Sequence, residues 1–368
     1  MTPTIAKPAA GTPVSQLDTP CMVVDLDALE HNMRVMAETY ANSSCKLRPH
    51  VKNHRSPEII RRQMAMGGTV EGVCSAKVSE AEVFVDAGIP QVLIANQAPT
   101  LDKVRRLAAL ANRADIIVAV DAPEHVGLLA DGAQEADVTI GVVIEINTSM
   151  GRAGIREADT SVALARLVTD SPGLRFRGIM SHQTMDGMPD RETRYLKARE
   201  YFAIVLEVKR VLEEAGFPVE IVSAGETWTY DVAAETPGIT EVQGGTYIMM
   251  SVPYSYMRDF KYAARVYGTV ISTPAPDTAI GDVPVEAIGA PDGELPTVEG
   301  LPGVRVRMIT PEHTVLEMDS RKPLRVGDRF ALITHQQDIT MTRWDQYVVA
   351  RDGLVVDVWD VPARGRHH

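Results

Sequence analysis

The chain alternates between short apolar, β-branched runs and amphipathic segments over its first 250 residues. Eight runs have the composition of strands, at residues 46–52, 69–75, 92–96, 116–121, 138–146, 175–182, 220–224 and 241–249. The segments between them carry apolar residues near positions i, i+3 and i+4 and a polar opposite face, which is typical of helices. Strand followed by helix, eight times over, predicts an α/β fold of the closed (β/α)8 barrel type. A doubly wound open sheet is the alternative; the strand count and the polar residues that follow each strand favour the barrel.

The pattern changes after about Tyr262. Residues 273–303 are rich in Pro, Gly and Asp and are expected to form loops. Short alternating runs then predict strands in a separate all-β domain, at residues 304–309, 313–318, 328–334, 346–353 and 354–361. The run at residues 19–25 is a further strand that could join either domain. We therefore expect a barrel domain over residues 25–262 and a β domain formed by residues 1–24 and 263–368.

Composition excludes several classes of protein. The 368 residues carry a net charge of -12, which argues against nucleic acid or an anionic membrane as a partner. No apolar run reaches the roughly 18 residues that a membrane helix needs, and the N-terminal stretch lacks the apolar core of a signal peptide. Cys21, Cys45 and Cys74 are an odd number without zinc-finger spacing, as expected in a reducing cytoplasm.

The predicted strand ends carry the residues of chemical interest. The stretch RPHVKNHRS (48–56), if extended, places His50, Lys52 and His54 on one face. Gly- and hydroxyl-rich segments, SAGET (223–227) and QGGTY (243–247), follow the seventh strand and overlap the eighth. Barrels often bind phosphate there, because glycine lets backbone N–H groups approach the oxygens. A lysine that can lose its charge forms Schiff bases, so the combination predicts pyridoxal 5'-phosphate (PLP).

Motifs along the chain carry a family resemblance. They are TPCMVVDLDALEHN (19–32), RPHVKNH (48–54), GVCSAKVSEAE (72–82), SMGRAG (149–154), GIMSHQ (178–183), VSAGETWT (222–229), QGGTY (243–247), EH (312–313) and a His–Asp region before YVVARDG (347–353). In this order they resemble the fold-type III PLP enzymes of the D-threonine aldolase/D-serine dehydratase family, relatives of the alanine racemases. The resemblance extends over nearly the whole chain.

The resemblance implies roles for individual residues. Lys52 would form the Schiff base with PLP, His50 would lie beside the cofactor, Arg152 would approach its phenolic oxygen and His182 would contact the ring. The remaining cofactor-binding residues, most of them at the phosphate end, would be Ser223, Gly225, Thr227, Gln243, Gly245 and Tyr247. The family also implies a head-to-tail homodimer, in which the β domain of one subunit closes the active site of the other.

The resemblance further implies a divalent metal held by a His and an Asp or Cys two residues later. Here His335 is followed at that spacing by Gln337, and Asp338 lies one position further. We expect His335 and Asp338 to bind the metal, with Gln337 as a weaker alternative. One imidazole and one carboxylate suit Mg²⁺, Mn²⁺ or Zn²⁺.

These features predict a PLP- and metal-dependent lyase that cleaves a D-β-hydroxy-α-amino acid to glycine and an aldehyde, with Lys52 and His335 as catalytic residues. The first alternative is elimination from D-serine or 3-hydroxyaspartate to a 2-oxo acid and ammonia. A second is an amino-acid racemase, which needs a tyrosine opposite Lys52 that the sequence does not identify. A non-catalytic PLP-binding protein is disfavoured by the hundred or so residues beyond the barrel.

Overall fold

The computed structural model describes residues 7–183, 188, 190–290, 293–319 and 323–368. Within these residues no helix combines the length and the apolar character needed to cross a membrane. The chain divides into two compact units, one formed by residues 35–52, 59–245 and 366–368, and the other by residues 1–34, 53–58 and 246–365. Residues 1–6, part of the predicted β domain, lie outside the described residues.

The first unit is built on an eight-stranded parallel sheet. Its strands are β2 (Lys46–Leu47), β3 (Val73–Ser75), β4 (Gln91–Ile94), β5 (Asp115–Val120), β6 (Ile140–Glu145), β7 (Leu174–Ser181), β8 (Ile221–Ala224) and β9 (Glu241–Val242). The spatial order is β2-β9-β8-β7-β6-β5-β4-β3. Single parallel bridges, Leu47 to Thr69 and His50 to Cys74, join the two ends of this order and close the sheet. The predicted (β/α)8 barrel is therefore confirmed.

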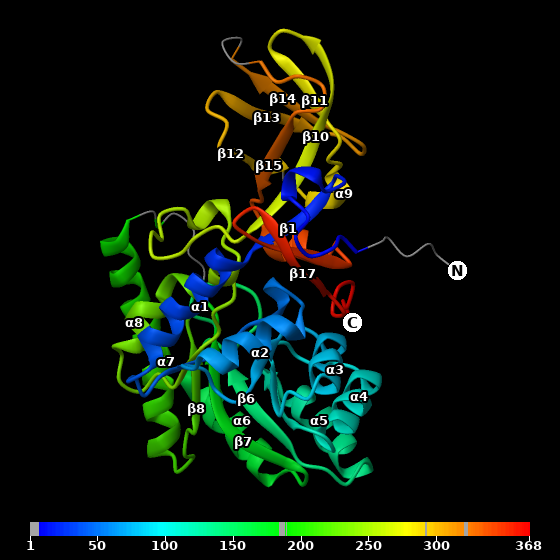
Figure 1. The fold of residues 1–368 in the computed structure, drawn as a ribbon. Coiled ribbons are helices and arrows are strands. Elements are labelled where there is room, and N and C mark those ends of the chain that lie inside the picture. The colour runs from blue at the N-terminus through cyan, green and yellow to red at the C-terminus, as the bar shows by residue number, and fades with distance from the viewer. Residues whose placement is uncertain (1–6, 184–187, 189, 291–292, 320–322) are drawn as a thin grey trace. The chain divides into compact units, whose positions relative to one another are not determined.

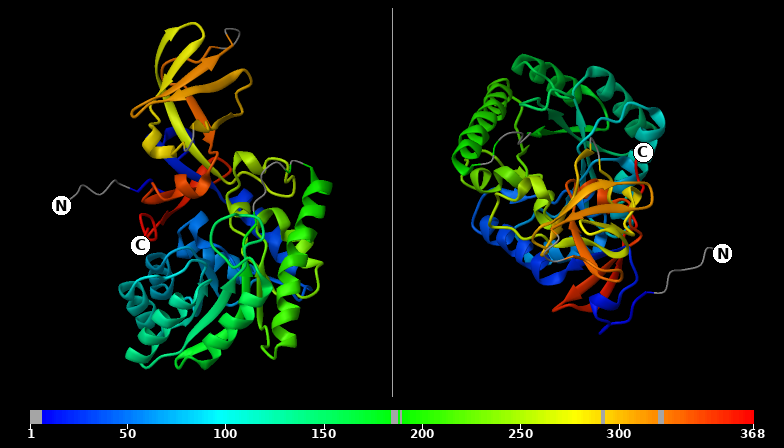
Figure 2. Two further views of the ribbon diagram at one scale, coloured as in Figure 1. Left: turned by 180° about the vertical axis from the view of Figure 1, so that it is seen from behind. Right: turned by 90° about the horizontal axis from the view of Figure 1, so that it is seen from above.

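One helix precedes these strands and the others connect them. They are α1 (Leu26–Tyr40), α2 (Pro57–Met66), α3 (Val78–Asp86), α4 (Leu101–Ala111), α5 (Pro123–Glu135), α6 (Ala158–Asp170), α7 (Arg191–Glu214) and α8 (Tyr230–Ala234). In the view from above, the cyan and green helices form an arc outside the strands (Figure 2). Inside the barrel, alternate strand residues pack into a buried apolar layer of Cys74, Leu93, Ile117, Ala119, Val143, Met180 and Ile221.

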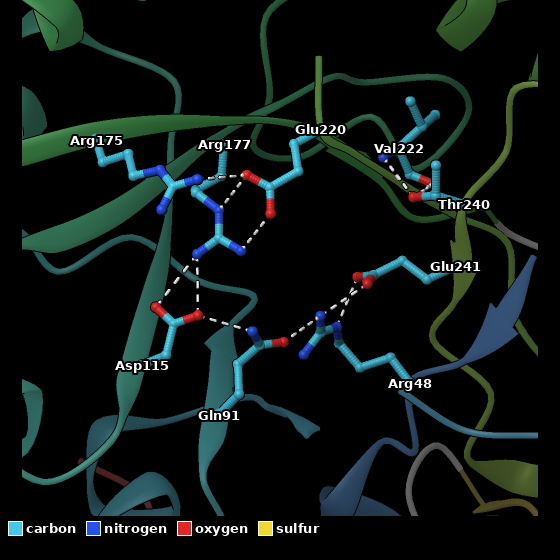
Figure 3. A network of polar contacts seen from close by, with 9 residues as sticks. All are labelled: Arg48, Gln91, Asp115, Arg175, Arg177, Glu220, Val222, Thr240 and Glu241. Carbon is cyan, nitrogen blue, oxygen red and sulfur yellow. Dashed lines mark hydrogen bonds and ion pairs between the residues drawn. The ribbon is translucent and has the colours of Figure 1, made fainter. Parts of the chain in front are cut away.

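Charged side chains connect the strands at the end where most of them begin (Figure 3). Arg48 donates to both oxygens of Glu241, at 2.6 and 2.7 Å, and to Gln91 at 2.7 Å. Gln91 donates to Asp115, and Arg177 pairs with Asp115 at 2.9 Å and with Glu220 at 2.6 Å. This network of charges lies at the end opposite to the rim where barrel enzymes carry their active sites, so its role is structural.

The second unit contains a nine-stranded sheet (Figure 1). Its strands are β1 (Cys21–Asp25), β10 (Ala264–Ala275), β11 (Thr278–Gly281), β12 (Thr297–Glu299), β13 (Val304–Ile309), β14 (Thr314–Met318), β15 (Arg329–Ile333), β16 (Gln346–Arg351) and β17 (Leu354–Asp360). Two short helices, α9 (Val285–Ile288) and α10 (Gln337–Met341), accompany them. The five strands predicted after residue 303 are all present. The early run joins this sheet, because β1 pairs with β10 and β16.

Two expectations about local structure are wrong. Residues 273–303 are not only loops: they contain the end of β10 and all of β11, α9 and β12. These strands form because β14 and β15 supply backbone partners from later in the chain, despite the Pro and Gly content. The predicted strand at 241–249 ends at Val242 and continues into a 3₁₀ helix, η4 (Thr246–Ile248).

Candidate active site

Three residues predicted to contact the cofactor interact at the carboxyl ends of the barrel strands. His182 directly follows β7, Arg152 lies on the loop after β6, and Lys52 lies in the turn after β2. Burial, together with the positive charges of Lys52 and Arg152, lowers the pKa of His182 to about 3, and burial is the largest of these causes. His182 is therefore a neutral imidazole at physiological pH, beside two cations.

The stretch around Lys52 is not extended, so the predicted alternation of His50, Lys52 and His54 on one face is wrong. The strand ends at Leu47, and Val51–Asn53 forms a 3₁₀ helix, η2. His50 is held by its own backbone, whose N–H donates to the carbonyl of Gly244 at 3.0 Å. The amide of Lys52 lies 3.5 Å from Nδ1 of His50. The two residues are neighbours through a turn rather than through strand geometry.

His54 was not predicted as a site residue, and its side chain makes a local contact with the backbone. Its Nδ1 accepts a hydrogen bond from the amide of Ser56 at 3.1 Å. The side chain is buried, and burial lowers the pKa of His54 to about 3.

The loop that carries Arg152 is held from two sides. Asp121, which follows β5, accepts a hydrogen bond from the amide of Gly154 at 2.7 Å. Arg156 donates to the backbone carbonyls of Arg152 and Gly154, at 2.7 and 2.5 Å. Gly154 has φ +100°, and a Cβ there would lie 2.6 Å from the amide nitrogen of Asn147. Asp121 and Arg156 were not predicted as site residues. The position of Asp121 directly after a barrel strand is the sequence feature that could have indicated its role.

Glu145 brings a buried carboxyl group to the same end of the barrel. It is the last residue of β6, and its Oε2 accepts from Gln97 at 2.6 Å. Burial raises the pKa of Glu145, the hydrogen bond and the charge of Arg152 oppose that rise, and Asp121 adds to it. The charge of Arg152 thus acts on both Glu145 and His182, which places this residue near both side chains.

The segment after β8 forms a tight turn of the kind predicted for a phosphate. Gly225 has φ +98°, and a Cβ at this position would lie 2.6 Å from Oγ1 of Thr229. The amide of Glu226 donates to that hydroxyl at 2.9 Å and is therefore used within the turn. Thr227 is fully buried in the 3₁₀ helix that follows. The carboxylate of Glu226 approaches Nε2 of His182 at 4.0 Å, a contact that sequence analysis did not predict.

The side chain of Gln243, a predicted cofactor residue, is hydrogen-bonded within a buried chain of polar groups. Its Nε2 donates to Oγ of Ser223 at 2.9 Å, and its Oε1 accepts from Sγ of Cys74 at 3.3 Å. All three side chains are buried. Gln243 consequently orients Ser223, whose hydroxyl proton is left for a further acceptor. Gly245, two residues on, ends the barrel unit.

Three predicted site residues belong to the other unit. Tyr247 is buried in η4 with its ring 5.6 Å from that of Phe260. His335 follows β15, and its Nδ1 lies 2.7 Å from Oε2 of Glu294, a residue that sequence analysis did not predict. Asp338 lies in α10, and its carboxylate accepts from the amide of Ile339 at 3.1 Å. No group of three or more His, Cys, Asp or Glu side chains suited to a metal occurs among the described residues.

The barrel residues have the chemistry that PLP requires. The positive charges of a primary amine and a guanidinium group both act on a neutral imidazole. A turn that excludes a Cβ and carries hydroxyl groups lies on the neighbouring strand end. Such a set can hold an aldehyde carbon, a phenolic oxygen and a phosphate at once.

Known proteins match both parts of the chain. The family described as "Alanine racemase, N-terminal domain" matches residues 24–253, and a "Putative serine dehydratase domain" matches residues 263–350. The chain is 33% identical to a D-threonine aldolase of Arthrobacter sp., over 96% of this chain and 95% of the relative. It is 34% identical to a 3-hydroxy-D-aspartate aldolase of Paracoccus denitrificans, over 97% and 94%.

Solved structures agree with these matches. The crystal structure of D-threonine aldolase from Filomicrobium marinum has a TM-score of 0.94 at 33% identity and covers 99% of this chain and 100% of its own. A mutant of D-threo-3-hydroxyaspartate dehydratase in the metal-free form has a TM-score of 0.84 at 26% identity, over 95% and 98%. The family resemblance is therefore confirmed, and the chain belongs to the alanine racemase N-terminal domain family, within the group of enzymes that includes the D-threonine and 3-hydroxy-D-aspartate aldolases.

Proposed function

We propose that the protein is a PLP- and metal-dependent lyase that cleaves D-β-hydroxy-α-amino acids by a retro-aldol reaction. The main supporting observation is that Lys52, Arg152 and His182 all lie at the carboxyl ends of barrel strands, near enough for both cations to lower the pKa of His182. It occurs in a chain related over nearly its full length to two aldolases that act on D-configured hydroxy amino acids. Small amino acids are thus the proposed substrates.

PLP would be held by the residues of the barrel unit. Lys52 would bind its aldehyde carbon, with His50 beside it, and Arg152 would bind its phenolic oxygen. His182 would face the ring, and the phosphate would lie at Ser223, Gly225, Thr227 and Gly245. Gln243 would hold Ser223, and Tyr247 is the predicted phosphate residue of the other unit. Bound there, PLP supplies an electron sink for the pair of electrons released at Cα.

The chain's own residues would handle the protons. His335 would accept the β-hydroxyl proton as the Cα–Cβ bond of the substrate breaks to release an aldehyde. Lys52 would then return a proton to Cα, giving glycine. Neutral His182 and Arg152 would keep the reacting plane in place without changing charge.

The predicted metal ligands are His335 and Asp338. A buried Nδ1 of His335 has no hydrogen bond of acceptable geometry among the described residues, which leaves it available to a metal. A bound Mg²⁺, Mn²⁺ or Zn²⁺ would lower the pKa of the β-hydroxyl group. Replacement of Asp338 by Asn, followed by measurement of metal affinity, tests this ligand.

A dehydratase is the second candidate, favoured by 30% identity to a D-threo-3-hydroxyaspartate dehydratase of Delftia sp. over 64% of this chain. In that reaction Lys52 would remove the α-proton and hydroxide would leave from Cβ. The products would be a 2-oxo acid and ammonia instead of glycine and an aldehyde.

Product analysis tests the function. Protein loaded with PLP and Mn²⁺ is incubated with D-threonine, D-serine and 3-hydroxy-D-aspartate, with and without chelator. We expect glycine with acetaldehyde or glyoxylate, and loss of product with chelator. Pyruvate or oxaloacetate with ammonia would establish the dehydratase instead, and no product from any of the three would refute both.

Replacement of Lys52 by Ala tests attachment of the cofactor. We expect the visible absorbance of the PLP-loaded protein to disappear and cleavage to fall by at least about a thousandfold, because Lys52 both binds and transfers a proton. Replacement of the partly exposed Lys103 in helix α4 in the same way is the control. An unchanged visible spectrum in the Lys52 variant would show that another group carries the cofactor.

We further propose a cytoplasmic head-to-tail homodimer with domains at residues 25–262 and at 1–24 with 263–368. Cys21, Cys45 and Cys74 are free thiols, which is consistent with a reducing compartment. Sedimentation velocity of the loaded protein tests the dimer.

A further inference from the structure

The register of two strands in the second unit brings Glu294 to His335. β12 and β15 run antiparallel, with Thr297 opposite Ile333. The residues shortly before β12 and shortly after β15 therefore meet at the same end of the pair. Oε2 of Glu294 lies 2.7 Å from Nδ1 of His335, and Nε2 of Gln336 donates to the same oxygen at 3.0 Å. The position of this carboxylate is thus set by strand pairing and by a hydrogen bond.

The contact between Glu294 and His335 is close but is not a hydrogen bond. Nδ1 of His335 is buried, and within the described residues it has no hydrogen-bonding partner of acceptable geometry. Nδ1 of His335 and Oε2 of Glu294 could instead both direct their lone pairs at one metal ion. Ligand atoms about 2.1 Å from one octahedral ion lie about 3 Å from each other, which is close to the observed separation.

Gln337 contributes a second unsatisfied atom next to the same residue. Its side chain is 2% exposed, and its Nε2 donates to the carbonyl oxygen of Thr246 at 2.8 Å. Because a carbonyl oxygen can only accept, the amide nitrogen must face Thr246 and Oε1 must point elsewhere. Oε1 is buried and has no hydrogen-bonding partner in the part of the chain that the structure describes. A buried amide oxygen without a partner is costly unless it binds something.

We infer that Glu294 and Gln337 join His335 as ligands of a divalent metal, which rests on the metal-dependent function proposed above. Beside the proposed ligand Asp338, these three residues would supply one imidazole nitrogen, one carboxylate oxygen and one amide oxygen. Two oxygens of this kind favour a hard ion such as Mn²⁺ or Mg²⁺ over Zn²⁺. Gln337 occupies the position at which related enzymes are expected to carry Asp or Cys, and Glu294 supplies the negative charge that an amide lacks.

Metal affinity of the PLP-loaded protein tests the inference without reference to turnover. Free Mn²⁺ is titrated by electron paramagnetic resonance into the wild type and into variants with Glu294→Gln and Gln337→Leu. Loss of a residue that only orients a ligand weakens metal binding about 10- to 100-fold, so we expect the Kd for Mn²⁺ to rise at least about tenfold in each variant. The rise in Tm that Mn²⁺ causes in the wild type should shrink in parallel.

Glu286→Gln, which alters an exposed carboxylate in the short helix α9, is the matched control and should leave the Kd for Mn²⁺ unchanged. Because Glu294 is partly exposed, its variant should keep the metal-free Tm of the wild type even if the Gln337 variant does not. A Kd for Mn²⁺ within twofold of wild type in Glu294→Gln overturns the inference, while retained aldol cleavage leaves the proposed function standing. Weakened Mn²⁺ binding in a protein that cleaves no hydroxy amino acid would support the site and refute the function.

Discussion

At the scale of single residues, burial decides which histidines carry charge. His54 and His182 differ in role, yet desolvation is the largest cause of the lowered pKa of each. Sequence analysis placed His182 in the site and left His54 out. It could not have assigned the charge of either, because desolvation depends on atoms from distant segments.

The pH dependence of stability follows from His54. Its pKa is about 3 in the folded protein and 6.5 in the unfolded chain, so only the unfolded state takes up a proton between these values. The contribution of His54 to the free energy of unfolding is complete above pH 6.5 and is lost as the pH falls from there towards 3. We expect the urea midpoint to fall less steeply between pH 7.5 and 5 in a His54→Gln variant than in the wild type. The exposed His367→Gln is the control, and equal slopes in all three proteins would contradict the assignment.

At the scale of elements, the loop between β6 and α6 shows how a flexible segment is made to present one side chain. Arg152 has no regular secondary structure around it. Its position depends on Asp121 of the preceding repeat and on Arg156 at the end of the loop. The motif SMGRAG identified Arg152 from the sequence, but these two supports come from contacts that no local pattern encodes.

Gly154→Ala should disturb this loop. At φ +100° an added Cβ would meet the backbone of Asn147 at 2.6 Å, so we expect a loss of roughly 1–3 kcal/mol of unfolding free energy and weaker PLP binding. Urea unfolding and a PLP fluorescence titration measure the two effects. Gly127→Ala in α5, where no atom lies within 4 Å of the added Cβ, is the control and should be neutral or stabilising. Equal effects at the two glycines would show that the loop tolerates the strain.

At the scale of the whole molecule, the two ends of the barrel differ in role: one end carries the candidate site residues and the other carries a structural network of charges. The rim of carboxyl ends carries Lys52, Arg152 and His182, while the opposite end carries the charged network of Figure 3. Arg48 and Glu241 are its most buried pair, with side chains 2% and 4% exposed. A pair this buried is costly to break because the remaining charge has no solvent to stabilise it.

Glu241→Leu should therefore cost about 3–5 kcal/mol of unfolding free energy, because it leaves the guanidinium group of Arg48 buried and without its carboxylate. The double variant Arg48→Met/Glu241→Leu should regain most of that loss, since two apolar side chains can pack where two charges did. Urea unfolding of the loaded protein measures both. The exposed pair Arg105 and Glu135 is the reference, and its disruption should have a small effect. A double variant no more stable than the single one would contradict this account.

The barrel, the all-β unit and a set of candidate barrel-site residues could be predicted from the sequence. Periods of 2.0 and 3.6 are local properties, and the residue after a strand is readable once the strand is located. Lys52 was predicted as a site residue in this way, even though the turn around it was predicted as a strand. The resemblance of the motifs then supplied roles for Arg152 and His182.

Features that depend on pairing between distant segments could not be predicted from the sequence. Strands formed within residues 273–303 because β14 and β15 complete their hydrogen bonds. Glu294 reached His335 because β12 and β15 share a register, although 41 positions separate the two residues. Backbone pairing and burial are properties of the folded chain, and no window of sequence contains both partners of such contacts.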